Sequence, residues 1–235
     1  MTNLLVGTSG YSYKEWKGSF YPEKLVAKDM LSYYAGRLNA VELNNTFYRM
    51  PQRTMVESWK TQVPDEFRFS VKASQRITHF KRLKEVTEET KYMLDTVSVL
   101  EDRLGVVLFQ LPPNMKKDLE RLESFLINLP SEIRATFEFR HPTWFDDEIL
   151  ELLRQHNRAL CVSDTDDLPV NRIDKTADWG YLRLRRVSYS NDELAEWKKR
   201  IKAQQWKTTL VFFKHEDEAT GPKLAAEFAA LYNET

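Results

Sequence analysis

The sequence lacks the features that mark secreted, membrane-bound and nucleic-acid-coating proteins. It has one cysteine, Cys161, which excludes an internal disulfide and is typical of a protein in a reducing cytosol. Lys plus Arg number 35 and Asp plus Glu number 35, so the net charge gives no argument for wholesale binding to nucleic acid or anionic lipid. The apolar run near the N-terminus is too short for a signal peptide or a membrane span. We expect a soluble, cytoplasmic protein with no membrane partner.

Internal repeats, low-complexity tracts and linkers are also absent. The chain has 235 residues, of which 42% are hydrophobic and 30% charged, as expected for a folded globular protein with one large core. We therefore expect a single domain over residues 1–235. No G-x-G-x-x-G motif follows any expected strand, so the sequence gives no indication of a dinucleotide-binding site. No cofactor is predicted.

Eight short segments with strand patterning alternate with segments of helical spacing. Such alternation is typical of parallel strands joined by crossover helices. Eight units in a chain of this length predict an α/β fold of the (β/α)8 TIM-barrel type, and a doubly wound open sheet is the alternative. The expected strands are residues 4–8, 40–44, 67–73, 105–111, 136–140, 159–164, 179–185 and 208–215.

The fifth of these segments, T-F-E-F-R, best shows what the strands carry. Phe137 and Phe139 share one face, because side chains alternate along a strand, and Thr136, Glu138 and Arg140 share the other. This pattern is typical of a strand whose apolar face is covered by helices and whose other face, with an acid and a base, points toward a polar site.

Every expected strand ends in a polar or charged group, and in a barrel of this type active sites lie at these carboxyl ends. Unpaired charges inside the barrel would cost several kcal/mol, so the groups need mutual pairing, water or a ligand. One interpretation is a structural ion-pair network that closes the barrel. The other is a pocket in which acids and bases meet a small anionic ligand.

In the functional interpretation, Glu138 acts as general acid or base, with Glu42 or Asp164 as its partner. Cations are well suited to bind phosphate or carboxylate groups, and Arg binds them in a bidentate manner. The residues expected to bind the substrate anion are Lys72, Arg140, Arg183 and Lys214, and those expected to orient it are Asn44 and Gln110.

Two further kinds of residue lie near these ends. His141 and His215 could join the acids as metal ligands, but no local spacing typical of a metal site appears and the nearby cations oppose one, so no metal is predicted. Trp144 and the loop aromatics around Tyr11 either cover the pocket or anchor their loops. We place His141, Trp144 and Tyr11 among the substrate-binding candidates.

Several motifs in order resemble the DUF72 family of YecE-like proteins across nearly the whole chain. They include G-T-S-G-Y at 7–11, V-E-L-N-N-T-F-Y at 41–48, F-R-F-S-V-K at 67–72, T-H at 78–79, F-Q-L-P-P at 109–113 and E-F-R-H-P-T-W at 138–144. The resemblance implies a TIM-type barrel and no established reaction.

The sequence departs from the commoner family pattern in three places. Tyr11 stands where Trp is usual, Arg185-Arg186 where His-Gly often occurs, and Lys214-His215-Glu216 where an Asn-Asn-Asp type ending is common. The last two departures make the ends of the seventh and eighth strands more cationic, in a region where barrels often bind phosphate.

The leading hypothesis is thus an enzyme that acts on a small anionic, phosphorylated, carboxylated or sugar-like compound by acid/base chemistry. A non-enzymatic ligand sensor or scaffold is the first alternative. Nucleic-acid processing is the second, and the balanced charge disfavours it. The sequence gives no oligomeric state.

Overall fold

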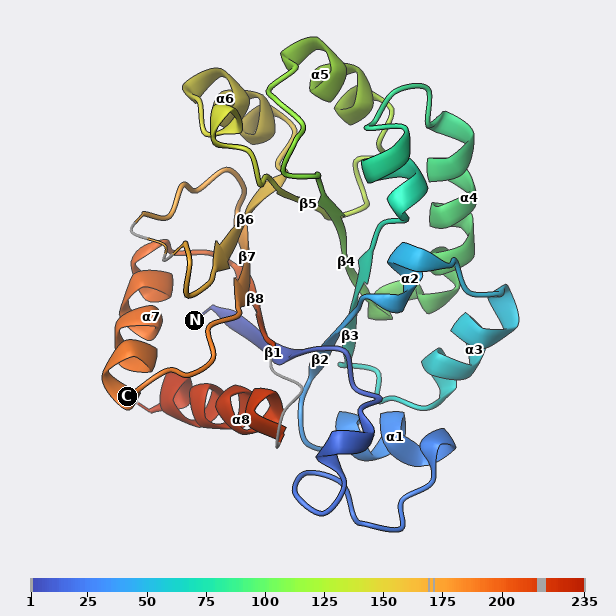
Figure 1. Ribbon diagram of the computed structural model, residues 1–235, viewed down its shortest axis with the longest axis vertical. Helices are drawn as coiled ribbons and strands as arrows, with labels where there is room; N and C mark the ends of the chain where they lie inside the picture. The colour runs from blue at the N-terminus through green and yellow to red at the C-terminus, as the bar shows by residue number, and fades with distance from the viewer. Residues whose placement is uncertain (1, 169, 171, 215–218, 235) are drawn as a thin grey trace.

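The computed structural model describes residues 2–168, 170, 172–214 and 219–234, and its eight strands form a closed parallel barrel (Figure 1). Neighbours in sequence are neighbours in the barrel, and β1 pairs with β8 to close it. The predicted TIM-barrel fold is confirmed. The strands are β1 (Asn3–Ser9), β2 (Ala40–Leu43), β3 (Arg68–Lys72), β4 (Leu104–Gln110), β5 (Ala135–Glu138), β6 (Ala159–Asp164), β7 (Trp179–Leu184) and β8 (Thr208–Phe213).

Helices surround the barrel (Figure 1). Short 3-10 segments and one π-helical turn (Arg76–Phe80) complete the connections. Between β6 and β7, the described residues form no helix, so the outer ring is interrupted there. The α-helices are α1 (Met30–Ala35), α2 (Asn45–Tyr48), α3 (Arg53–Thr61), α4 (Thr87–Val97), α5 (Leu119–Ile127), α6 (Asp147–Gln155), α7 (Asn191–Ala203) and α8 (Thr220–Asn233).

Side-chain caps explain where three of the α-helices begin. Asp118 and Asp146 accept hydrogen bonds from backbone amides at the starts of α5 and α6, and Ser190 forms a capping box with Glu193 at the start of α7. At the start of α3, Gln52 occupies the cap position without a side-chain hydrogen bond.

Two connections are irregular. The segment after β2 contains the short helix α2. The helix α4 ends at Val97 and continues as a 3-10 helix with Glu101 at positive φ. The expected strand end at His215 lies outside the described residues, and β8 ends at Phe213.

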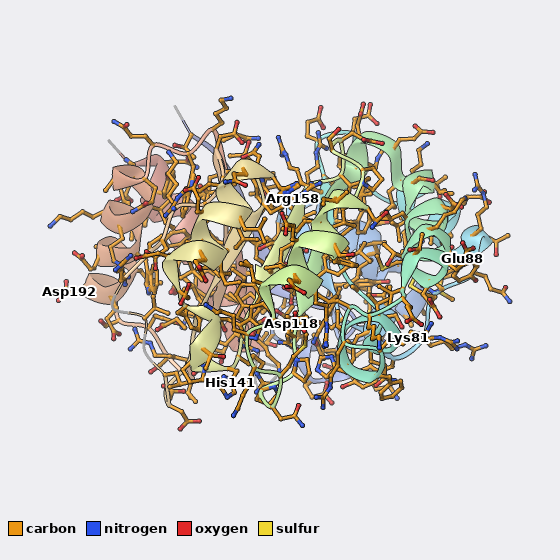
Figure 2. All side chains as sticks on the ribbon, turned by 90° about the horizontal axis from the view of Figure 1, so that it is seen from above. Lys81, Glu88, Asp118, His141, Arg158 and Asp192 are labelled. Atoms are coloured by element: carbon orange, nitrogen blue, oxygen red, sulfur yellow. The ribbon has the colours of Figure 1, made fainter. Side chains whose placement is uncertain are left out.

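The barrel interior divides into an apolar layer and a polar layer. The apolar layer fills the end where the strands begin, with side chains such as Leu5, Val106 and Trp179. At the other end, where the strands finish, the inward positions carry buried polar side chains such as Ser9, Glu42, Glu138 and Arg183. Figure 2 shows the two ends: Arg158, just before β6, lies near one of them and His141, after β5, near the other.

Gly7 shows how tightly the first two strands pack. A Cβ atom on Gly7 would lie 1.8 Å from the carbonyl oxygen of Ala40, so only glycine fits at this position. This close approach places Ser9, two residues on, beside Glu42. No helix formed by the described residues is long and apolar enough to cross a bilayer.

Candidate functional site at the mouth of the barrel

One arginine joins two carboxylates inside the barrel mouth. Arg183 Nη2 donates to Glu42 Oε1 at 2.8 Å, and its Nη1 donates to Glu138 Oε2 at 2.5 Å. All three residues are buried, with exposed fractions of 3%, 0% and 1% respectively. We call Glu42, Arg183 and Glu138 the inner cluster. The predicted convergence of these residues, from three distant parts of the chain, is present in the structure.

Hydrogen-bond donors surround Glu42. Tyr181 Oη donates to Glu42 Oε2 at 2.6 Å, and Ser9 Oγ and Asn44 Nδ2 bond to Oε1 at 2.7 and 3.0 Å. Burial by itself raises the pKa of Glu42, but the charge of Arg183 and these donors outweigh burial and leave the pKa below its ordinary value. Glu42 is therefore an ionised carboxylate at neutral pH.

Glu138 is compensated by two arginines. Arg185 Nη2 donates to Glu138 Oε1 at 3.0 Å, and Gln110 also hydrogen-bonds to this carboxylate. Burial raises the pKa of Glu138, yet Arg183 and Arg185 overcome that effect and lower the pKa to about 2. A carboxylate with so low a pKa is a weak base, so the environment does not favour the acid/base role that the sequence suggested for it.

Lys72 reaches the same region from the end of β3. Its Nζ lies 4.3 Å from the centre of the Phe47 ring. Burial, followed by the positive charge of Arg183, lowers the pKa of Lys72 to about 8. Lys72 thus loses its proton closer to neutral pH than an ordinary lysine.

His79 is a mouth residue that reasoning from the sequence missed. Its ring packs edge-on against Phe47, with centroids 4.8 Å apart, and its Nδ1 lies 2.9 Å from Thr78 Oγ1. Burial and then the charges of Lys72 and Arg140 lower the pKa of His79, so the imidazole is close to both cations. The sequence contains the T-H motif at 78–79, but the motif lies on a π-helical turn and not on a strand. Strand alternation therefore does not indicate that His79 faces the mouth.

Other missed residues belong to the inner faces of the strands. Ser9 and Tyr181 bond to Glu42, and Ser70 Oγ lies 2.6 Å from Tyr181 Oη. Tyr181 lies two positions before Arg183 and therefore on the same face of β7. The alternation of side chains along β7 is the sequence signal that could have identified Tyr181 as a mouth residue.

A cavity of about 1000 Å³ adjoins Glu138 on the side of β6. Arg140 and Lys214, both exposed, line it together with Arg185, whose Nη2 also donates to Ser163 Oγ at 2.6 Å. Cys161 lines it as well, and burial raises the pKa of its thiol well above the ordinary value, so the thiol is neutral. The cavity therefore combines three cationic groups and the Glu138 carboxylate with a neutral thiol.

The expectation that Asp164 lies inside the mouth is wrong. Asp164 pairs in the sheet with Leu184, and both belong to the outward-facing set, whereas Ser163 pairs with the inward Arg183. Its Oδ2 accepts hydrogen bonds from Arg186 Nε and Tyr189 Oη, both at 2.8 Å. Asp164 and Arg186, with Glu193 on α7, form a separate outer cluster.

Three other candidates lie outside the inner cluster. Trp144 is completely buried, stacks on Phe139 with centroids 4.6 Å apart and donates to the Met115 carbonyl, so it anchors its loop and does not cover the mouth. His141 is partly exposed and caps the following 3-10 turn through Thr143. Tyr11 packs near Tyr34, in the outer core.

No group of three or more His, Cys, Asp and Glu side chains among the described residues is arranged to hold a metal ion. His215, named above as a potential ligand, lies outside the described residues. Three buried polar atoms of the mouth, Asn44 Oδ1, Arg183 Nε and Arg185 Nε, form no hydrogen bond with the described residues.

Comparison with known proteins places this architecture among uncharacterised relatives. Residues 5–235 match the family model described as "Protein of unknown function DUF72". UPF0759 protein YecE of Escherichia coli is 35% identical over 116 residues, which cover 49% of this chain and 43% of YecE. UPF0759 protein YunF of Bacillus subtilis is 28% identical over 156 residues, covering 63% and 54%. The matches thus span about half the length of these curated relatives.

A solved DUF72 protein from Thermotoga maritima has the same fold along the whole chain. Its TM-score is 0.86 at 29% identity, and the superposition covers 99% of this chain and 100% of that one. The resemblance of the motifs to the DUF72 family is therefore confirmed. The names of these relatives indicate no substrate.

Proposed function

The chain belongs to the DUF72 family, and from this premise and the chemistry of its mouth we propose that it binds a small anionic compound and acts on it by proton transfer. Glu42 and Glu138 hold the arginines in place, while Lys72 and Arg140 bind the anion. Lys72 takes the proton-transfer role that the sequence suggested for Glu138.

The observation that carries the proposal is an excess of positive charge around the inner cluster. Among the residues that the structure describes, neither Lys72 nor Arg140 has a carboxylate within ion-pair distance, although both lie close enough to His79 to lower its pKa. Two carboxylates there face Arg183, Arg185, Lys72 and Arg140. An anion is the group that would complete this charge balance.

The proton-transfer part rests on the different environments of the titratable groups. A catalytic acid or base works best when its pKa is near the working pH. Lys72, with a pKa of about 8, meets that condition, and Glu138, with a pKa of about 2, does not. Gln110, bonded to Glu138, and the unbonded Asn44 Oδ1 are suited to orient a ligand.

Binding without turnover is the alternative that a specific observation favours. The carboxylates of the inner cluster are fully used in ion pairs, as expected if they only shape a receptor for an anion. For nucleic-acid processing the support is weaker, because the aromatic side chains around Trp16 pack on one another: Tyr13 and Phe20 lie 4.7 and 5.7 Å from its ring centre. Bases cannot stack on faces already covered.

Sulfate binding measured by isothermal titration calorimetry tests the proposal. The charge of sulfate is constant between about pH 6 and pH 9, so any change in affinity over this range comes from the protein. We expect Arg140→Ala and Lys72→Met each to weaken binding about tenfold or more, as for a lost charged hydrogen bond. Arg53→Ala is the matched control, since Arg53 is an exposed arginine of α3 that pairs with Glu57.

The pH dependence separates Lys72 from Arg140. Lys72 is protonated below its pKa of about 8, so wild-type sulfate affinity should fall as the pH rises through that value. The fall should disappear in Lys72→Met and persist in Arg140→Ala. Wild-type protein that binds no sulfate, or binds it equally well in both variants, would contradict the proposal.

A further inference from the structure

The barrel wall is weakest between β5 and β6. These strands share only two register pairs, Thr136 with Ala159 and Phe137 with Leu160, whereas every other neighbouring pair of strands shares three to six. The strands separate beyond Phe137, so the residues that follow on either side are not joined by the ladder. The separation begins at the level of Glu138.

On the outside of the barrel α6 packs against β6, and beyond β6 the described residues before β7 form a loop and no helix (Figure 1). The cavity of about 1000 Å³ lies here and is lined from both faces of the wall. Cys161 and Ser163 belong to the inward face of β6, and Leu160 and Val162 to its outward face. The cavity therefore passes from the mouth through the wall, and we call it the wall cleft.

The outer part of the wall cleft is apolar. Phe145 and Leu168 line it with exposed fractions of 56% and 73%. Val170, beside them, is fixed at both backbone groups: its amide donates to Asp164 Oδ1 and its carbonyl accepts from Arg200 Nη1, each at 2.9 Å. Asp164 thus helps to hold the apolar rim in place.

Charge is unevenly distributed along the wall cleft. Among the described residues that line its inner end, Arg140, Arg185 and Lys214 accompany one carboxylate, Glu138. At the outer rim Arg172 is paired with Asp174, and Asp167 adds a further carboxylate. Among the described lining residues, positive charge therefore predominates where the wall cleft meets the mouth, and the apolar surface begins beyond it.

From this arrangement we infer that the anion bound at the mouth carries an apolar group, which lies in the wall cleft between β5 and β6. The inference rests on the proposed function and specifies its ligand class: an amphiphilic anion. Its charged group is bound by Lys72 and Arg140 as proposed above, and its apolar body extends past Arg185 to Val162, Phe145 and Leu168. The volume of the wall cleft falls within the range of small-molecule sites.

Methyl sulfate and n-hexyl sulfate test this inference, because they carry the same charge and differ only in apolar length. Each buried methylene strengthens binding by about fourfold, which corresponds to ~0.8 kcal/mol. We expect n-hexyl sulfate to bind wild type at least about tenfold more tightly than methyl sulfate, even if only part of the chain is buried.

Two exposed apolar residues allow the position of the alkyl group to be tested without disturbing the core. The double variant Phe145→Ser/Leu168→Ser should lose most of the hexyl advantage and keep its methyl sulfate affinity. Ile127→Ser is the matched control, because Ile127 on α5 is 67% exposed and does not line the wall cleft. That variant should keep the full advantage.

The outcomes separate this inference from the proposed function. Methyl sulfate binding without a gain from the hexyl chain would overturn the inference and leave anion binding at the mouth intact. A hexyl gain that survives in the double variant would also overturn it, since the chain then lies elsewhere. If neither sulfate ester binds wild type, both proposals fail.

Discussion

The inner and outer clusters use the same chemistry on opposite faces of the barrel wall. In the inner cluster Arg183 is 3% exposed and both of its partners are buried. In the outer cluster Asp164 is buried, but the Arg186 and Glu193 side chains are 23% and 42% exposed. Water can solvate the outer charges if a partner is removed, whereas in the inner cluster only protein groups or a ligand can. The two clusters should therefore respond differently to the same substitutions.

The largest effect is expected from Arg183→Met. This change leaves two buried carboxylates without their shared cation, and breaking a buried pair costs about 3–5 kcal/mol. Urea unfolding at pH 7 should show that loss. Adding Glu42→Gln and Glu138→Gln should restore part of it, because no buried charge then lacks a partner. An Arg183→Met protein as stable as wild type would remove the distinction between the clusters.

Glu138→Gln should have the next largest effect and should depend on pH. The folded-state pKa of about 2 lies below the ordinary value of 4.5, so ionised Glu138 stabilises the fold above about pH 4.5. That contribution, about 3 kcal/mol for such a shift, is lost as the pH falls from 4.5 toward 2. Unfolding free energies of wild type and Glu138→Gln should therefore converge in acid. Parallel pH curves would contradict this account.

Asp164→Asn should cost less, about 1–2 kcal/mol, because an amide keeps part of the bonding to Tyr189 and Val170 and the freed Arg186 is reached by water. Sulfate affinity at the mouth should not change, since Asp164 faces outward. Calorimetry of unfolding and of binding on the same protein measures both. Weaker sulfate binding by Asp164→Asn than by wild type would contradict the separation of the two clusters.

The smallest effect is expected from Glu193→Gln. The amide retains the capping-box bond to Ser190 and loses only a half-exposed ion pair with Arg186. Such pairs contribute about 0–1 kcal/mol and are screened by salt. Thermal unfolding at low and high salt should show a small difference that shrinks as salt rises. A large, salt-independent loss would place this pair in the same class as the inner cluster.

Strand alternation explains which parts of the site were predictable. Glu42, Glu138 and Arg183 lie between apolar residues of the opposite phase, so the sequence predicted that they face inward together. Asp164 was misplaced because it was chosen as a strand end, although Leu160 and Val162 of the same strand share its phase and face outward. The fold itself followed from counting eight strand and helix units.

Other features depend on interactions that periodicity does not encode. The low pKa of Glu138 requires the burial and the two arginines that only the closed barrel brings to it. The wall cleft requires knowing where the ladder between β5 and β6 stops, and register is set by packing across the barrel. His79 lies on an irregular turn for which strand phase gives no information.

A carbon-13 NMR titration of the glutamate side-chain carboxyls tests the central claim most directly, with Glu42→Gln and Glu138→Gln used to assign the two signals. The account predicts that both carboxylates titrate below the ordinary glutamate pKa of 4.5, with Glu138 titrating at about 2. A midpoint between about pH 5 and pH 8 for either signal would make that residue a proton-transfer group and contradict its role as a fixed counter-ion.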